Sequence, residues 1–597
     1  MFQVPGCRYR PAPTGYAIDM VNIPNYIWLR GVTLITVLML FSLTACTPRQ
    51  LPPAKTPDRA QISATLPATD NQLPATDLPA FEDRLPATAI PATAVPEQPV
   101  YLPDYLPKGL SEAFRLPPGY YATAEAANAA FSLKLWSPGL GSTQSITWWT
   151  YALVAPFPTI PGEVSADELR GAWAGESSGP FAGLPLLVDE ETRKVFSTRW
   201  GEPADGAVQV LPAENLIEAA WTQRPSWGIV PFEALEPRWK VLSVDGVSPL
   251  SIDFDPTGYA LSVPFALVTP PGLYDWSLPI GNRDPNRLTV VNMTGVTALV
   301  RGTALMMERY GIPYPARDIG SLLASVDITH INNEVPFYAE CPEPALDWPW
   351  LISCSPPDYI ELLNLVGADV IELTGDHFGD WPPESMDLTL SLDEAHGMAT
   401  FGGGLNAETA RQPALFEHNG NRLAFIGCHI GGEVKTETPE HALATDELPG
   451  AALCDFEWLA EEIPSLISQG YQVIFTFQHQ EIYSYPASER LVADFSLPAQ
   501  MGATLVSGSQ AHQPHGFAFD SGAFIHYGLG NLFFDQYHYC TDYACDRAFI
   551  DRHVFYAGRH ISTELIPIRF MDMARPRLMI PDEAARFLEI IFTASGW

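Results

Sequence analysis

The stretch ADVIELTGDHFGD, residues 368–380, decides the fold of the second half of the chain. Its apolar run Asp369–Leu373 includes β-branched residues and predicts a short buried strand. A polar turn with Asp376 and His377 follows at once, and Asp380 comes three residues later. Because ligands and catalytic groups gather where the strands of an α/β sheet end, this turn is a candidate site.

Helices are expected on both sides of this strand. Ser355 and the two prolines after it predict the start of a helix over 358–366, and a second helix is expected over 382–396. This order is typical of an αβα unit with a largely parallel sheet. Asp376 and His377 should then point into the crevice at the carboxyl edge of that sheet. An ordinary helix cap and a histidine bonded to a neighbouring carboxylate are the alternative interpretation.

Size and composition limit the class of protein. A chain of 597 residues is expected to form two or three domains, and a hydrophobic content of 47% supports globular ones. The net charge of −36 argues against a nucleic-acid partner, because phosphates would be repelled. The eight cysteines form no C-x-x-C or Cys/His zinc spacing, so disulfides are favoured over a structural zinc.

The amino end predicts export. Arg30 precedes the apolar run Gly31–Leu43, which is too short to span a bilayer comfortably. The next residues complete the sequence Leu-Thr-Ala-Cys over 43–46, which resembles the lipobox of a bacterial lipoprotein signal. The resemblance implies that Cys46 is lipidated and that the mature protein is extracytoplasmic, anchored to the bacterial cell membrane by acyl chains. An uncleaved membrane anchor is the alternative.

Composition divides the chain into regions. The expected regions are a signal peptide (1–46), a Pro/Ala/Thr-rich disordered tether (47–100), a smaller α/β domain (101–285) and a larger α/β domain (286–597). Leu-Pro-Ala-Thr recurs three times between residues 66 and 88, a composition that cannot bury enough apolar surface to fold. In the third region, the Ser-x-x-Glu helix start at 165–168 and the sequence of 227–232 resemble the second lobe of periplasmic solute-binding proteins. A working lobe and a repurposed one both stay open.

The second half of the chain carries short motifs in a fixed order. They are Gly295–Leu299, Asn332–Glu334, Gly375–Asp380, Gln478–Glu481, Gly508–His512 and Gly528–Leu532. In this order they resemble the CapA family of capsule and poly-γ-glutamate synthesis proteins, whose fold is similar to that of calcineurin-like metallophosphatases. The resemblance implies a metallophosphatase-type sandwich, a divalent metal ion, and an anionic cell-surface polymer or its precursor as partner.

The same resemblance assigns roles to residues at the expected strand exits. The implied metal ligands are Glu334, Asp376, His479 and His512, and the implied catalytic residues are His377, Asp380 and His512. His377 is the natural general acid of such a site. The first aspartate of the family pattern falls on Val296, and its paired histidines fall on Ser509 and Gln510. These departures would reduce a two-ion centre to a single-ion site or to none. His429 and His515 are weaker candidates.

Six cysteines are left for disulfides if Cys46 is lipidated and Cys7 lies in the leader. The expected pairs are Cys341–Cys354, Cys428–Cys454 and Cys540–Cys545, and this even count fits an oxidising compartment.

The sequence therefore supports two hypotheses. The first is an exported, lipid-anchored protein that acts in synthesis, release or anchoring of an anionic surface polymer by metal-assisted hydrolysis or transfer. The second is a binding module without turnover, with a degenerate metal site. The retained acidic and histidine residues favour the first, and Val296 favours the second.

Overall fold

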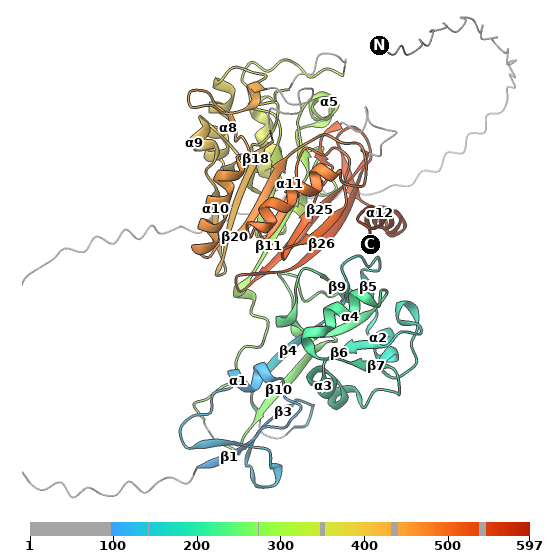
Figure 1. Cartoon of the computed structure of the whole chain (residues 1–597). Coiled ribbons are helices and arrows are strands. Elements are labelled where there is room, and N and C mark those ends of the chain that lie inside the picture. Colours follow the sequence, from blue (N-terminus) through green and yellow to red (C-terminus); the bar gives the residue numbers. More distant parts are fainter. Residues whose placement is uncertain (1–96, 141–142, 273, 347–352, 431–439, 536–544) are drawn as a thin grey trace, which may run out of the picture. The chain divides into compact units, whose positions relative to one another are not determined.

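The computed structural model describes residues 97–597 except 141–142, 273, 347–352, 431–439 and 536–544 (Figure 1). The predicted signal peptide, Cys46 and nearly all of the predicted tether lie outside the described residues. Residues Ala92–Trp597 form one compact unit. No helix within the described ranges combines the length and the apolar character that crossing a bilayer requires.

The amino-terminal lobe is built on a ten-stranded mixed sheet. Its longest strand, β4 (Thr143–Pro156), pairs antiparallel with β10 (Ser262–Val268) and with β8 (Trp227–Pro231). Helix α2 (Ala166–Trp173) begins with a capping box of Ser165 and Glu168, as the Ser-x-x-Glu pattern predicts. The other main elements are β1 (Gln98–Tyr101), α1 (Lys108–Ala113), β2 (Tyr120–Thr123), β3 (Phe131–Leu135), β5 (Glu163–Val164), β6 (Leu186–Val188), α3 (Glu190–Trp200), β7 (Val208–Val210), α4 (Leu216–Thr222) and β9 (Trp239–Val244).

The C-terminal domain is a sandwich of two sheets. A nine-stranded sheet comprises β11 (Leu288–Thr294), β12 (Val296–Thr297), β13 (Ile328–Asn333), β14 (Ala368–Glu372), β15 (Ala399–Phe401), β24 (Asn531–Phe533), β25 (Arg547–Tyr556), β26 (Arg559–Phe570) and β27 (Pro576–Leu578). A six-stranded sheet comprises β17 (Ala414–His418), β18 (Asn421–His429), β20 (Gln472–Gln478), β21 (Leu505–Gly508), β22 (Phe517–Asp520) and β23 (Ala523–His526). Inner-face residues of both sheets share one apolar core.

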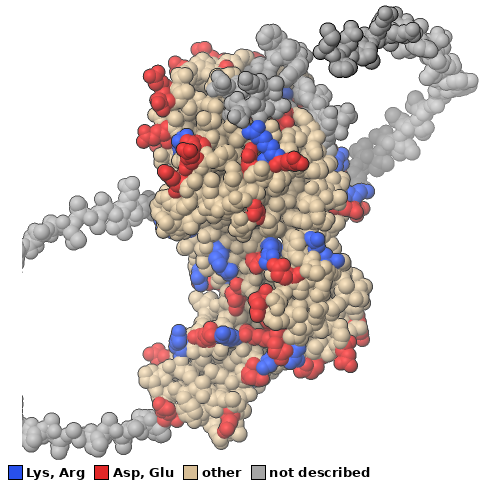
Figure 2. Space-filling model, viewed as in Figure 1, with Lys and Arg blue, Asp and Glu red and all other residues tan. Residues whose placement is uncertain are grey.

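Helices cover the outer faces of the sandwich. The first sheet packs against α5 (Arg301–Tyr310), α7 (Ile360–Leu365) and α8 (Glu384–Ala395), and the second against α10 (Phe456–Ser468) and α11 (Glu489–Gln500). Helix α12 (Pro581–Ala594) closes the core at the C-terminus. Figure 2 shows acidic and basic side chains interspersed on the face that it presents. The predicted α/β fold class, with a sandwich in the C-terminal half, is confirmed.

The central unit forms as its sequence predicts. Strand β14 occupies the apolar run and pairs parallel with β13, with Asn332 opposite Glu372. The preceding helix begins as a 3₁₀ turn at Pro357–Tyr359 before α7, and α8 begins after Pro383. Proline at a first turn loses no hydrogen bond, so both starts agree with the sequence.

Two of the three expected disulfides are confirmed. Cys341 bonds to Cys354 with a Cα–Cα distance of 5.8 Å, and Cys428 bonds to Cys454 with a Cα–Cα distance of 5.0 Å. Cys545 is also disulfide-bonded. Its expected partner, Cys540, lies outside the described residues.

Candidate functional site

The strand exits that carry the candidate residues lie side by side. Val296 of β12 pairs with Asn332 of β13 and with Asn531 of β24, and β13 pairs in turn with β14. The turn after β14 crosses directly over the end of β13. A Cβ atom at Gly375 would lie 2.4 Å from the carbonyl oxygen of Glu334, so only glycine fits there.

Glu334 stands at the centre of this edge. Its side chain is buried, and its Oε1 has no hydrogen-bond partner among the described residues. Burial raises the pKa of the Glu334 carboxyl to about 7. The imidazole of His512 opposes this shift, and the carboxylate of Asp376 adds to it. Both groups therefore act electrostatically on Glu334, although they come from turns far apart in sequence.

The turn after β14 holds a chain of charged side chains. His377 donates from Nδ1 to Asp380 Oδ2 at 2.7 Å, and its Nε2 lies 3.8 Å from Asp376 Oδ1. Asp380 also accepts from His441 Nε2 at 2.9 Å and from the hydroxyl of Ser353. Oδ1 of Asp376 is buried and accepts no hydrogen bond within the described part.

These contacts set the charge of the turn. Burial alone would lower the pKa of His377, but the charge of Asp376 and the hydrogen bond to Asp380 outweigh it and raise that pKa to about 10. Burial likewise opposes the shift at Asp380, but its bond to His377 lowers the Asp380 pKa to about 2. His377 is therefore a cation at neutral pH, fixed in orientation by Asp380.

His512 completes the group from the opposite sheet. Its Nδ1 donates to Asn531 Oδ1 at 2.8 Å, and its Nε2 lies 3.9 Å from Glu481 Oε1. The structure thus brings Glu334, Asp376, His377, Asp380 and His512 close to one another. We call these five residues the edge cluster. Their roles stay predictions.

His479 is not part of the edge cluster. In β20, Phe475 and Phe477 face the helices α10 and α11, and alternation places His479 on the same side. There its Nε2 lies 2.8 Å from Asp494 Oδ2 of α11.

His429 lies closer to the edge cluster than His479 does. Its Nδ1 lies 3.0 Å from the Thr374 carbonyl oxygen, and its Nε2 has no partner in the described part of the chain. Burial lowers the pKa of His429 even though the charge of Asp376 opposes this. The sequence made His429 a weaker candidate. In β18, however, the alternation of side chains places His429 on the same inward face as Leu423 and Phe425.

The residues that depart from the family pattern are packed or hydrogen-bonded within the protein. Val296 is buried in an apolar group with Val335 and Phe534. Ser509 donates to Gln478 Oε1 at 2.9 Å, and the Gln478 amide donates to Gln510. A two-ion centre therefore does not fit these positions. Among the described residues, no three or more His, Cys, Asp or Glu side chains are grouped so as to hold a metal ion.

A single hard cation fits the edge cluster better. Glu334 and Asp376 each present a carboxylate oxygen without a protein partner among the described residues. Magnesium is commonly held by one or two carboxylates and keeps several waters, so it does not need a full protein cage.

Several polar groups beside the edge cluster escaped prediction. Both amide atoms of Asn332, Nδ2 of Asn333 and Oγ1 of Thr297 are buried without a partner in the described part. The Asn332-Asn333 pair at a strand tip was a usable signal. Ser353 and His441 gave none, because they reach Asp380 from loops distant in sequence.

Residues 290–536 match the family model described as the bacterial capsule synthesis protein PGA_cap. The C-terminal half carries a PGA_cap domain. The family expected from the motif order is thereby confirmed. No curated protein matches the chain.

Solved structures resemble the chain only distantly. An ABC-type phosphate transport receptor from Vibrio cholerae is 14% identical with a TM-score of 0.24, and the match covers 30% of this chain and 89% of the receptor. A hypothetical protein from Thermus thermophilus is 15% identical with a TM-score of 0.29, and the match covers 48% of this chain and 99% of that protein. At these TM-scores the likeness carries no argument about ligand or activity.

The edge cluster of the PGA_cap domain combines groups that suit acid–base chemistry. It sets a protonated imidazole beside a carboxyl whose pKa is about 7, among buried polar atoms without partners in the described residues. Groups held in different protonation states at one pH are the usual arrangement for an acid and a base.

Proposed function

We propose that this protein acts outside the cytoplasmic membrane, tethered by a lipid on Cys46, and that its PGA_cap domain hydrolyses or transfers a linkage of an anionic capsule-type polymer. The family model supports a role in capsule synthesis. A polymer of the poly-γ-glutamate type is the substrate class that the sequence resemblance favours.

One observation carries the proposal. Glu334 and Asp376 are buried carboxyl groups, and each leaves an oxygen without a hydrogen bond within the described part of the chain. A buried polar atom without a partner costs roughly 1–3 kcal/mol, and a core that served stability alone would remove it. The free oxygens are therefore best explained by a ligand that binds there.

The edge cluster can divide the proton transfers of hydrolysis between two groups. Glu334, with a pKa of about 7, takes a proton from the attacking water. His377, which is protonated at neutral pH, gives a proton to the leaving group. Asp380 holds the imidazole in place for this step.

A divalent ion is part of the proposal. Glu334 and Asp376 would hold it through their free oxygens, helped by the side-chain oxygen of Asn332. When bound, such an ion supplies Lewis-acid stabilisation of negative charge on the reacting group.

Binding of the polymer without turnover is the second candidate. It is favoured by Val296, Ser509 and Gln510, which occupy ligand positions of the family pattern with groups that are apolar or already bonded to one another. The edge cluster would then hold a segment of the polymer and leave its bonds intact.

The test is to incubate the full chain with poly-γ-glutamate and Mg²⁺ and to follow polymer length by gel filtration. The proposal expects shortening or transfer that Asp376→Asn and His377→Gln abolish. Asp393→Asn is the matched control, because Asp393 is another buried aspartate without partners in the described residues but sits in α8. Binding with unchanged polymer length in the unmutated protein would favour the second candidate, and neither binding nor cleavage would overturn both.

A further inference from the structure

A second cavity lies at the opposite edge of the first sheet from the edge cluster. Its volume is about 690 Å³, within the range of small-molecule sites. Val290 lies near the start of β11 and Ser325 and Val326 precede β13, so the cavity adjoins the amino ends of strands whose carboxyl ends carry the edge cluster. The two sites are therefore separate.

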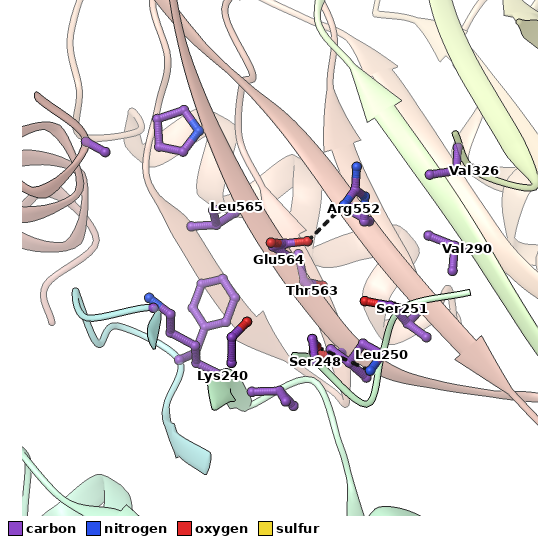
Figure 3. A pocket seen from close by; sticks show the side chains of 18 of the residues that line it. Lys240, Ser248, Leu250, Ser251, Val290, Val326, Arg552, Thr563, Glu564 and Leu565 are labelled. Carbon is purple, nitrogen blue, oxygen red and sulfur yellow. Dashed lines mark hydrogen bonds and ion pairs between the residues drawn. The ribbon is translucent and has the colours of Figure 1, made fainter. Parts of the chain in front are cut away.

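Both parts of the compact unit line this cavity. Figure 3 shows Lys240 and Ser251 from the amino-terminal lobe facing Arg552 and Glu564 of the β25–β26 pair. The two parts also share an apolar core beside the cavity, where the rings of Phe232 and Tyr556 pack 5.1 Å apart. The walls thus belong to elements that pack directly against one another.

The lining carries two cations and two anions, of which one pair is in contact. Arg552 Nη1 lies 3.3 Å from Glu564 Oε2, which pairs one cation with one anion. Asp253, the other acidic residue of the lining, forms no ion pair with Lys240 among the described residues. Lys240 is the cation that remains.

Lys240 is held by carbonyl groups rather than by an acid. Its Nζ donates to the backbone oxygens of Thr159 at 2.6 Å and Ile160 at 3.0 Å. No carboxylate of the described residues lies within 4.0 Å of this Nζ. Burial lowers the pKa of Lys240 to about 8, and Glu564 only partly opposes this. An anion placed beside the ammonium would relieve that cost of burial.

The rest of the lining is largely apolar on one side. The apolar residues are Phe157, Leu250, Leu565, Leu588 and Phe592. Ser248 and Ser251 add hydroxyl groups on the side of the lobe. A ligand that suits this lining has a single negative charge at one end and an apolar body.

We propose that this cavity is a second binding site, between the amino-terminal lobe and the PGA_cap domain, for an amphipathic monocarboxylate whose head group lies at Lys240 and whose body packs on Leu565 and Leu588. We expect this ligand to bind without a large rearrangement of the protein, because ligand sites are usually preformed. The ligand would contact both parts of the unit at once.

The probe is a ten-carbon carboxylate with a photoreactive diazirine at its far end, used on the full chain in lipid nanodiscs. After irradiation, mass spectrometry should find the label on peptides that contain Leu565 or Leu588, and excess decanoate should remove it. The matching decanamide, which lacks the charge, should label these peptides about tenfold less, as expected for loss of one charged contact.

Variants then test the head-group assignment. Lys240→Met keeps an apolar stem of similar length and should weaken labelling by about tenfold. Lys194→Met is the matched control, since the Lys194 ammonium pairs with Asp104 at 3.1 Å on the surface, and it should label normally. Asp376→Asn should also label normally, which separates this site from the edge cluster. Labelling that is spread over the surface, or equal in Lys240→Met and the unmutated protein, would overturn the proposal.

Discussion

Glu372 and Glu334 are buried glutamates at the ends of neighbouring parallel strands, and their surroundings shift their pKa values in opposite directions. Glu372 accepts from His330 Nε2 at 3.0 Å and from the Thr374 hydroxyl at 2.5 Å. Burial alone would raise its pKa, but His330 outweighs burial and holds the Glu372 pKa below its usual value. Glu334 has an oxygen without a partner in the described part, and its pKa rises to about 7.

This difference separates a structural acid from a candidate functional one. Glu372 gains partners that favour its charged form, so its charge stabilises the fold. Glu334 is destabilised in its charged form, a cost that a bound ligand or ion can relieve. Burial of a carboxylate therefore says little by itself, and the partners of each oxygen decide between the two roles.

The largest expected effect comes from removing the paired acid. Glu372→Gln leaves His330 without its anion and should cost about 3 kcal/mol of unfolding free energy at pH 7, measured by urea denaturation. Because the folded pKa of Glu372 is lowered, its contribution is present above pH 4.5 and is lost as the pH falls below that value. A loss under about 1 kcal/mol would contradict the assignment of Glu372 as structural.

The disulfide beside the edge cluster should rank next. Cys354 follows Ser353, which bonds to Asp380, so the Cys341–Cys354 bridge supports the His377 side of the edge cluster. Replacing both cysteines by serine should cost about 3 kcal/mol, which is the loss of chain entropy expected when a bridge closes a loop of about 15 residues. Thermal unfolding measures this, with Glu372→Gln as the comparison. Unchanged stability would show that the bridge does not constrain the chain.

Replacing the unpaired acid, Glu334, should change stability in the opposite direction. Glu334→Gln removes a charge that the fold holds poorly, so it should raise stability at pH 8 by roughly 1–3 kcal/mol. With a folded pKa of about 7, the stability that Glu334 contributes is present below pH 4.5 and is lost as the pH rises through 7. The variant should therefore show a flatter stability profile between these values. A loss of stability at pH 8 would contradict the claim that the charged form of Glu334 destabilises the fold.

A smaller effect is expected at the imidazole. Asp380→Asn removes the anion that bonds to His377 Nδ1, so the pKa of His377 should fall from about 10 by about one unit or more. Titration of the imidazole by NMR measures this. His441→Gln is the control, because His441 contacts Asp380 and not the ring. An unchanged His377 pKa in Asp380→Asn would assign the shift to other charges.

Much of this site could be predicted from the sequence. Glu334 and Asp376 follow buried strands of one parallel pair, so their convergence followed from strand order. His512 follows β21 of the other sheet, and strand order alone does not bring it to the same place. Side-chain direction was harder to predict. His479 and His429 both end strands, but the alternation of facing residues sends one toward α11 and the other toward the edge cluster.

Contacts made by loops and between domains lay beyond the sequence. Ser353 and His441 approach Asp380 from segments with no pattern that fixes their position. The Lys240 cavity is likewise formed by two parts of the chain that no local periodicity relates.

Equilibrium dialysis of the full chain against Mn²⁺ tests most directly whether the edge cluster binds a ligand through its free oxygens. Metal content is measured in the unmutated protein, in Asp376→Asn and in Glu372→Gln. We expect about one bound ion, lost in Asp376→Asn and retained in folded Glu372→Gln, because Glu334 and Asp376 are the members of the edge cluster with a carboxylate oxygen that has no partner among the described residues. Equal metal content in Asp376→Asn and the unmutated protein, or none in either, would contradict it.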